Sequence, residues 1–346
     1  MPAEMRTVVM RPGQLTVERR PIPEPGHGQV LVKTLACGIC GSDLHLYRHA
    51  GEMLEMGRAA GVAEEILNRG VVLGHEFVGE ILRHGPGCEG RMPVGSRVTS
   101  TPFIKGELEA IPMGSTPYVD GAYAEYFLLS ESSMLAVPDG LPTEAAALVE
   151  PLAIGIHAVN RARLDEADAG LVIGCGPIGL AVIVALRMRG VETIVASDLS
   201  PRRRLLAKEM GASIVVDAAQ ESVFAAIPHS AQHAPALVFE CTGVSGLIAQ
   251  AVDLAPSRSE IVVAGIAHGA ESFTPMTAIS KELSLHFASF YSESEFCSAI
   301  DALSSGEVPW QSWITGKVDL HGVADAFDQL RDPEQHAKIL IYPHGA

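Results

Sequence analysis

The chain has 346 residues, 47% of them hydrophobic, so it is long enough for two domains with packed cores. Glycine is abundant at 34 residues and aromatic residues are scarce at 5%, which favours an α/β protein over an all-β sandwich. Lys and Arg total 25 against 41 for Asp and Glu, a net charge of −16. Such an acidic surface repels nucleic-acid phosphates and anionic lipid, so we expect no nucleic acid and no membrane among its partners.

The first residues, 1–11, contain no apolar core of a signal peptide, which predicts a cytoplasmic protein with reduced cysteines. The uncharged stretch Ala169–Leu186 has about the length of a membrane span. Its glycines and proline would break a helix exposed to lipid, so we predict a buried strand, turn and helix there instead.

Residues up to about Glu150 are dense in Gly and Pro and have short apolar alternations, which indicates a compact β-rich domain. Val30–Thr34 and Phe77–Leu82 are predicted strands of this domain. Between them, apolar residues recur at helical spacing over Glu52–Asn68, and we predict an inserted helix that ends at Gly70.

From Pro151 onward, strand-like and helical segments alternate, which predicts a parallel sheet with helices on both faces, a doubly wound Rossmann fold. The predicted helices are Pro177–Met188 and Pro201–Met210. The predicted strands are Leu171–Ile173, Thr193–Ser197, Ile214–Val216, Leu237–Phe239 and Ile261–Ala264.

A G-x-G-x-x-G motif lies between the first of these strands and the first helix, where a dinucleotide-binding turn needs it. It consists of Gly174, Cys175, Gly176, Pro177, Ile178 and Gly179. The first glycine permits a tight turn, the second admits the pyrophosphate to the backbone, and the third lets helix and strand pack closely. The free N–H groups at the start of the helix would then bind the phosphates.

Asp198 follows at the end of the next predicted strand, where a carboxylate accepts both ribose hydroxyls and repels a 2′-phosphate. This position favours NAD over NADP as the cofactor. The alternative is that Arg202, Arg203 and Arg204 form a clamp for a 2′-phosphate.

Three other segments carry potential metal ligands: Cys37 to His45, the pair His75 and Glu76, and Glu150. None of them is specific alone, because a C-x-x-C pair also occurs in redox sites and a His beside a Glu is often ordinary surface. Together they offer the donors of a catalytic zinc, which takes about three protein ligands and keeps one position open.

With these segments the chain resembles the zinc-containing medium-chain dehydrogenases, in particular the branch of sorbitol, butanediol and threonine dehydrogenases. The matching stretches are Cys37–His45, Gly74–Gly79, Asp120–Tyr126, Val149–Ala158, the glycine motif with Asp198, Glu240–Val244 and His336–Ile341. The resemblance implies a GroES-like catalytic domain at 1–153 and 296–346 and a Rossmann NAD-binding domain at 154–295.

The resemblance also implies the roles of individual residues around one catalytic Zn²⁺. Cys40 resembles the thiolate ligand and His75 the imidazole ligand. Glu150 stands where other branches place a Cys or Asp ligand, and Glu76 is the alternative, either replacing it or exchanging with it on the metal. Cys37 is interpreted as a packing residue.

Further roles follow from the same match. Asp43 resembles the partner that orients the His ligand, Ser42 the relay hydroxyl nearest the substrate, and His45 the end of the relay that passes the proton to water. Arg203 and Lys338 resemble contacts to the cofactor.

The activity implied is reversible oxidation of a secondary alcohol or polyol, a small-molecule substrate, with hydride transfer to NAD⁺. Two alternatives remain, a zinc-free reductase of the quinone or enone type and a non-catalytic dinucleotide-binding protein. Members of this branch form homodimers or homotetramers, and the predicted edge strand Leu283–Phe290 is the segment expected to pair between subunits.

Two features depart from the family. Thr101–Tyr118 contains no Cys where relatives carry four that bind a structural zinc, so we predict no structural Zn²⁺. The predicted helix at Glu52–Asn68 is longer than usual; Met53, Leu54 and Met56 either line the substrate pocket or serve ordinary packing or a subunit contact, and packing is the favoured interpretation.

Overall fold

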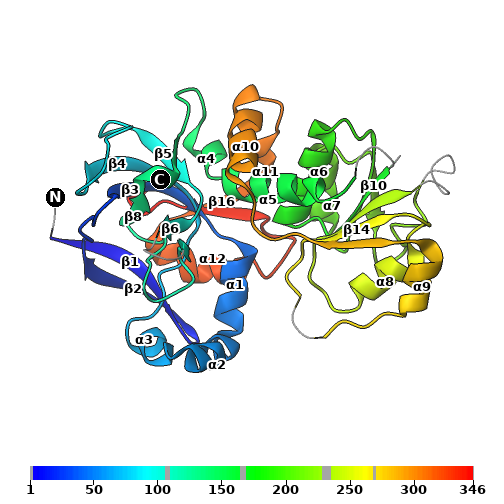
Figure 1. Cartoon of the computed structure of the whole chain (residues 1–346), viewed down its shortest axis with the longest axis horizontal. Coiled ribbons are helices and arrows are strands. Elements are labelled where there is room, and N and C mark those ends of the chain that lie inside the picture. The colour runs from blue at the N-terminus through cyan, green and yellow to red at the C-terminus, as the bar shows by residue number, and fades with distance from the viewer. Residues whose placement is uncertain (1–2, 106–109, 164–168, 228–234, 268–269, 346) are drawn as a thin grey trace. The chain divides into compact units, whose positions relative to one another are not determined.

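The computed structural model describes residues 3–105, 110–163, 169–227, 235–267 and 270–345 (Figure 1). The chain divides into two compact units, Met1–Glu150 with Ile314–Ala346, and Pro151–Trp313. Within the described ranges, no helix combines the length and the apolar character needed to cross a membrane.

The first unit is built on a seven-stranded sheet with the order β16-β17-β3-β4-β5-β9, in which β8 also pairs with β3. Its strands are β3 (Gln29–Gly38), β4 (Glu76–His84), β5 (Arg97–Ser100), β8 (Tyr126–Ser130), β9 (Met134–Ala136), β16 (Ile314–Val318) and β17 (Lys338–Ile341). Two hairpins accompany the sheet, β1 (Glu4–Arg11) with β2 (Gln14–Pro21), and β6 (Phe103–Lys105) with β7 (Ala110–Pro112).

The helices of this unit are short. They are α1 (Gly41–Arg48), α2 (Ala50–Ala60), α3 (Ala63–Asn68), α4 (Thr143–Ala146), α12 (Val323–Gln329) and the 3₁₀ turns η1 (Glu131–Ser133) and η3 (Leu320–Gly322). The first two residues of the helix α5 (Val149–Asn160) belong to the first unit, and the rest of α5 belongs to the second.

The central strand β3 holds the first unit together because it pairs along its length with β4 and at its two ends with β8 and β17. Val30 and Val32 are fully buried in the apolar core, together with Phe127 and Ile81 of the neighbouring strands. The burial of each such side chain stabilises the fold by roughly 1.5–3 kcal/mol. The ends of β3 are therefore firmly placed.

The inserted segment is two helices, so the prediction of one helix over Glu52–Asn68 is wrong. Gly61 adopts a left-handed conformation with φ of 74°, which ends α2 before α3 begins. Gly70 ends α3 as predicted, with φ of 71° and its N–H bonded to the carbonyls of the last turn. Leu54 packs against the core of the first unit, which agrees with the packing interpretation, whereas the side chains of Met53 and Met56 lie outside the described ones.

The second unit contains a six-stranded parallel sheet with the order β12-β11-β10-β13-β14-β15. The strands are β10 (Ala169–Ile173), β11 (Thr193–Asp198), β12 (Ile214–Asp217), β13 (Ala236–Glu240), β14 (Glu260–Val263) and β15 (Ser284–Phe287). In sequence order within the unit this is 3-2-1-4-5-6, the order of the Rossmann fold, so the predicted fold class is confirmed.

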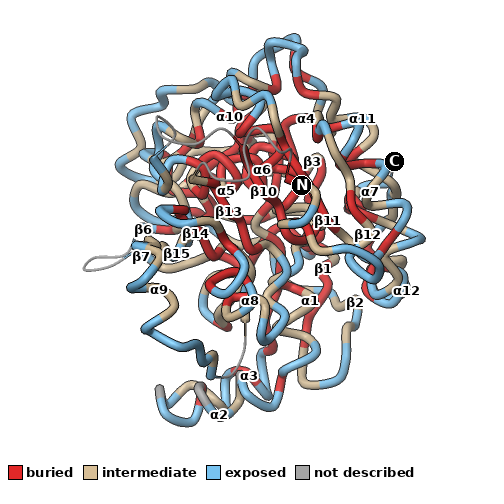
Figure 2. The backbone as a smooth tube through the Cα atoms, turned by 90° about the vertical axis from the view of Figure 1, so that its right-hand side faces the viewer, coloured by how far each residue is buried: buried red, intermediate tan, exposed pale blue. Residues whose placement is uncertain are grey.

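Helices cover this sheet, with α6 and α7 on one side and α8 and α9 on the other (Figure 1). They are α6 (Pro177–Met188), α7 (Pro201–Glu209), α8 (Leu247–Leu254), α9 (Pro275–Lys281), α10 (Glu293–Ser305) and α11 (Trp310–Trp313). Every residue of β10 and β13 is buried, as Figure 2 shows, which explains why these strands are continuous apolar runs without alternation.

The strand β15 lies at an edge of the sheet, as expected for Leu283–Phe290, and covers the first half of that stretch. Phe287 and Phe290 are 65% and 54% exposed in the single chain. An edge strand with large exposed apolar side chains is a surface suited to pairing with another strand.

Glu295, at the start of α10, makes contacts in the second unit whose contribution to stability can be tested. Its carboxylate accepts hydrogen bonds from the Ser292 N–H at 2.7 Å and the Asn160 amide at 2.7 Å, and lies 3.0 Å from His157 Nδ1. Burial opposes its ionisation, but these partners outweigh burial and lower the pKa from 4.5 to about 2.

We therefore predict that Glu295→Gln destabilises the protein at neutral pH. The stabilisation is present above the ordinary carboxyl pKa and is lost as the pH falls toward the folded-state pKa. The difference in unfolding midpoint between wild type and variant should stay constant above about pH 5 and narrow below it. Glu293→Gln, two residues away and exposed, is the matched control. A difference between wild type and Glu295→Gln that does not depend on pH would contradict the assignment.

Candidate active site

Asp43, in the first turn of α1, is the centre of a buried hydrogen-bond network. Its carboxylate accepts the Tyr123 hydroxyl at 2.7 Å and the backbone N–H of Cys40 at 3.1 Å. The other oxygen lies 3.5 Å from Nδ1 of His75. One fully buried carboxylate therefore joins the start of α1, the segment before β4 and the segment before β8.

His75 lies between Asp43 and Ser42, because its Nε2 is 3.4 Å from the Ser42 hydroxyl. Burial disfavours the imidazolium form, but the nearby Asp43, Cys40 and Glu150 outweigh burial and raise the pKa of His75 well above its usual range. Burial also raises the pKa of Asp43, against the influence of His75 and Tyr123. With Nδ1 turned toward Asp43, the imidazole has Nε2 available for a metal or a relay hydroxyl.

Tyr123 was not among the predicted site residues, although it lies within the matching stretch Asp120–Tyr126. Its ring packs against Gly74, where an added Cβ would lie 2.4 Å from the ring carbon Cδ1. Gly74 also has a φ of 104°, which L side chains rarely adopt. Glycine at this position therefore lets the chain pass Tyr123 and turn His75 toward Asp43.

Glu76 and Lys338 form a buried ion pair beside this network. The ammonium of Lys338 is 2.7 Å from each oxygen of the Glu76 carboxylate and donates to the carbonyl of Ile39 at 3.0 Å. Their exposed fractions are 1% and 0%, respectively. A Cβ on Gly38 would lie 2.1 Å from the Glu76 carboxylate, so glycine at the end of β3 makes room for the pair.

This pair bears on two predicted roles. Glu76 as a zinc ligand would have to share oxygens that both already bind Lys338. Lys338 as a cofactor contact would have to reach a ligand from a fully buried position in the first unit. Both roles remain predictions, but the sequence did not reveal that the two side chains bind each other.

Glu150, the second residue of α5, is 8% exposed. Its charge contributes to the raised pKa of both His75 and Lys338, so it lies close to the same network as Cys40. The ligand atoms of Cys40, His75 and Glu150 do not all lie within 4.8 Å of one another. A thiolate, an imidazole and a carboxylate nevertheless fit the donor preference of zinc.

Ser42 and His45 are three residues apart on α1 and therefore share one face of that helix. The ring of His45 stacks on that of His49 with centroids 4.2 Å apart, and His49 in turn lies 3.1 Å from the carboxylate of Glu52. Polar groups thus continue from Ser42 along α1 to exposed residues. Cys37 is fully buried in the apolar core of β3, in agreement with a packing role.

The glycine motif in the second unit has the conformation that its sequence predicts. Gly174 has a φ of 93°, and a Cβ there would lie 2.4 Å from Thr242 Cγ2. A Cβ on Gly179 would lie 1.9 Å from the carbonyl oxygen of Gly174. Gly176 caps α6, Pro177 is its first residue and Ile178 is half-buried in its first turn, so this helix presents free N–H groups toward the loop.

Asp198 ends β11 next to this loop and accepts the backbone N–H groups of Cys175 and Ser200, both at 2.8 Å. The side chain of Arg203 approaches Gly176 from α7, with Nη1 3.9 Å from the site of a Cβ. Arg204 donates to the Asp198 carbonyl at 2.8 Å and to Asp217 at 3.2 Å. Arg204 is therefore engaged with the strand ends, while Arg203 is the arginine that reaches the glycine turn.

Comparison with known proteins agrees with both units. Residues 26–139 match the alcohol dehydrogenase GroES-like domain, and residues 177–305 match the zinc-binding dehydrogenase domain. The chain is 31% identical over 339 residues to (R,R)-butanediol dehydrogenase of Bacillus subtilis, covering 95% of this chain and 97% of the relative. It is 28% identical over 359 residues to sorbitol dehydrogenase of the same organism, covering 99% of each.

A solved structure of rspB from Escherichia coli CFT073, described as an alcohol dehydrogenase complexed with NADH, superposes with a TM-score of 0.85 at 26% identity. The similarity covers 99% of this chain and 100% of that one. Every element that carries the site residues thus lies within the matched length.

The buried Glu76–Lys338 pair generates a prediction about stability. Lys338→Met leaves the Glu76 charge buried and unpaired, which costs roughly 3–5 kcal/mol of unfolding free energy. Adding Glu76→Gln removes that charge, so the double variant should be more stable than Lys338→Met alone. Urea unfolding followed by circular dichroism measures both.

The exposed pair Lys317–Glu144, with a 2.8 Å separation, is the control. Lys317→Met should cost less than about 1 kcal/mol. If Lys317→Met and Lys338→Met lower the unfolding free energy equally, the buried pair stabilises the protein no more than the exposed pair does.

Proposed function

Because the chain belongs to the zinc-dependent medium-chain dehydrogenase family, we propose that it oxidises a secondary alcohol or polyol reversibly, with hydride transfer to NAD⁺. The observation that carries this proposal is that one carboxylate, Asp43, binds the Cys40 backbone at 3.1 Å and lies 3.5 Å from His75. Glu150 lies near enough for its charge to raise the pKa of His75. The relatives named for butanediol and sorbitol support a diol or polyol as the class of substrate.

Cys40, His75 and Glu150 are the residues that would hold one catalytic zinc. Zinc bound there would act as a Lewis acid and lower the pKa of the substrate hydroxyl. Glu150 is preferred to Glu76 as the third ligand because the Lys338 ammonium, bound to both Glu76 oxygens, would repel a second cation there. Asp43 is a positioning residue that holds the His75 ring by its Nδ1 side.

Proton release is assigned to Ser42 and His45. The Ser42 hydroxyl lies beside His75, where it can accept the alcohol proton, and His45 lies on the same face of α1 nearer to exposed groups. A nicotinamide cofactor bound at the glycine motif would accept the substrate's C–H electron pair as hydride. Ser42 and His45 would carry the hydroxyl proton to water, which leaves the carbonyl product and balances the reaction.

The cofactor is proposed to bind at Gly174–Gly179, with Arg203 near its phosphates and Asp198 on the ribose hydroxyls. The Asp198 carboxylate favours NAD over NADP because it would repel a 2′-phosphate. The 2′-phosphate clamp by Arg202, Arg203 and Arg204 is less supported, since Arg204 is held by Asp198 and Asp217.

Several finer points are part of the same proposal. Without cysteines at 101–118, that segment cannot hold a four-thiolate structural zinc. The catalytic domain is proposed at 1–153 and 296–346 and the cofactor domain at 154–295, although the compact units assign residues 296–313 to the unit that holds the glycine motif. The assembly is proposed to be a cytoplasmic homodimer or homotetramer that pairs along β15. A zinc-free quinone or enone reductase would not need Cys40, His75 and Glu150 together, so it is disfavoured, as is a non-catalytic dinucleotide-binding protein.

Cys40→Ala tests the proposal. It should abolish alcohol-dependent reduction of NAD⁺, by roughly a thousandfold or more if the metal supplies several kcal/mol. Binding of NADH, followed by nicotinamide fluorescence, should persist because the glycine motif is untouched. A panel of secondary alcohols and polyols is the substrate set.

Cys297→Ala, a cysteine in the second unit, is the matched control and should keep full activity. Full alcohol oxidation by Cys40→Ala would reject the zinc mechanism. Reduction of quinones or enones by the wild type without alcohol oxidation would support the zinc-free alternative.

A further inference from the structure

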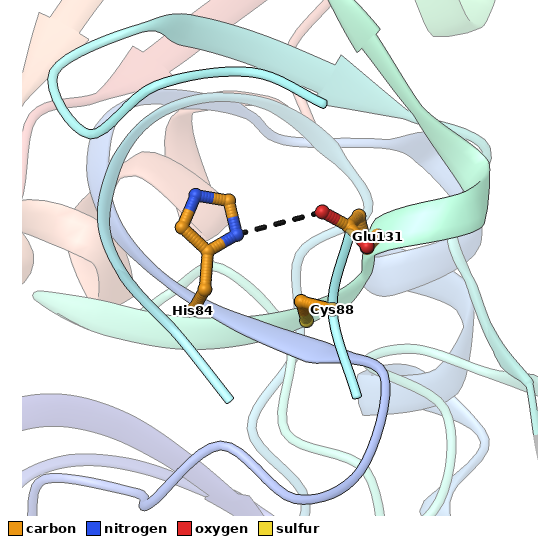
Figure 3. Close-up of side chains that lie close together, drawn as sticks. All are labelled: His84, Cys88 and Glu131. Carbon is orange, nitrogen blue, oxygen red and sulfur yellow. Dashed lines mark ion pairs between the residues drawn. The ribbon is translucent and has the colours of Figure 1, made fainter. Parts of the chain in front are cut away.

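His84, Cys88 and Glu131 lie together in the first unit (Figure 3). His84 lies at the opposite end of β4 from Glu76 and its neighbour His75. His84 ends β4, Cys88 lies in the following loop, and Glu131 begins the turn η1. Their ligand atoms all lie within 4.8 Å of one another. They unite three donor types, an imidazole nitrogen, a sulfur and a carboxylate oxygen.

The Glu131 carboxylate is firmly fixed and is only 6% exposed. It accepts the backbone N–H groups of Glu89 at 2.6 Å, Gly90 at 2.7 Å and Arg91 at 3.3 Å. The loop after β4 therefore wraps around this carboxylate. Each carboxylate oxygen can accept more than one partner, so capacity remains for a further interaction.

His84 presents a lone pair toward that carboxylate. Its Nε2 lies 3.0 Å from the carbonyl oxygen of Met92, so Nε2 carries a hydrogen and Nδ1 is unprotonated in the neutral ring. Nδ1 is buried without a hydrogen-bond partner and lies 3.6 Å from a Glu131 oxygen (Figure 3). Two acceptors that face each other repel, unless a proton or a cation lies between them.

Cys88 makes a cation the better explanation, because its sulfur lies beside the pair. Its thiol donates a hydrogen bond to the carbonyl oxygen of Gln29 at 3.2 Å, and metal binding would displace that proton. A lone imidazolium–carboxylate pair needs no third donor, whereas a metal ion needs about three protein ligands. Ligand atoms around tetrahedral zinc are about 3.5 Å apart, so small side-chain movements would suffice to close this set on an ion.

We propose that His84, Cys88 and Glu131 form a second metal site of the chain, which takes a divalent ion of borderline softness, zinc by preference. A nitrogen, sulfur and oxygen set suits Zn²⁺ over Mg²⁺ or Ca²⁺, which take oxygen ligands. The fourth position is left to water. This zinc would be structural, so the proposal replaces the expectation of no structural Zn²⁺, which rested only on the absence of cysteines at 101–118.

The ion would fasten the loop after β4 to the turn η1, two segments about 40 residues apart in sequence. Binding to the folded state alone stabilises it by mass action, so zinc should raise the unfolding temperature of the catalytic unit. The role is structural, and alcohol oxidation does not depend on it.

The test counts metal by mass spectrometry after chelation, incubation with Zn²⁺ and removal of the excess. The wild type should hold two zinc ions per chain, and Cys88→Ser one. The control Cys297→Ser should keep two. Cys88→Ser should keep alcohol oxidation within about twofold, because Cys88 takes no part in catalysis.

Cobalt distinguishes this site from the catalytic one. The Cys40→Ala chain loaded with Co²⁺ should still show a thiolate-to-cobalt absorption band, and adding Cys88→Ser should remove it. His84→Asn in the Cys40→Ala chain should also weaken the band. This second variant tests the site independently if Cys88→Ser fails to fold.

No thiolate band in cobalt-loaded Cys40→Ala, or an unchanged zinc count in Cys88→Ser, would overturn the second site. His84 would then be an imidazolium paired with Glu131. Failure of the catalytic proposal gives a different result: the Cys40→Ala chain would then keep the zinc content of the wild type.

Discussion

The arrangement of the active site depends on one buried carboxylate, that of Asp43. Taking such a charge out of water is costly unless hydrogen bonds and an opposite charge compensate it, and three segments of the chain meet to do so. Tyr123 and the Cys40 backbone donate to it, and the His75 imidazole lies opposite. The need to satisfy Asp43 therefore fixes the imidazole proposed as a metal ligand and, through the α1 N-terminus, the position of Cys40.

The Glu76–Lys338 pair imposes a second constraint at the end of β3. It joins the first residues of β4 and β17, while Gly38 leaves the space that the pair fills. Charge on Cys40 and Glu150 raises the pKa of both His75 and Lys338 against the effect of burial, and Glu76 also raises that of Lys338, so these groups are electrostatically coupled. This coupling, together with the occupied Glu76 oxygens, is what favours Glu150 as the third ligand.

Local patterns were enough to predict the Rossmann sheet. The strands around Gly174–Gly179 and Asp198 are buried on both faces of the sheet, so their sequences are continuous apolar runs. The resemblance to the zinc-containing medium-chain dehydrogenases brought Cys40, His75 and Asp43 into one hypothesis. The sequence did not reveal the partnerships of Tyr123 with Asp43 and of Lys338 with Glu76, which join residues 80 and 262 positions apart. Only the pairing of strands brings such residues together. The break at Gly61 was missed because apolar spacing continues across it, although a glycine there permits a left-handed turn.

The central claim is a catalytic zinc held by one thiolate, one imidazole and one carboxylate. X-ray absorption at the zinc edge, on the Cys88→Ser chain, measures it most directly because only the catalytic ion remains. The account predicts one sulfur neighbour per zinc, with lighter nitrogen and oxygen neighbours completing the shell, and loss of the bound zinc when Cys40→Ala is added. Two or more sulfur neighbours, or a sulfur-free shell in the chain that retains Cys40, would contradict it.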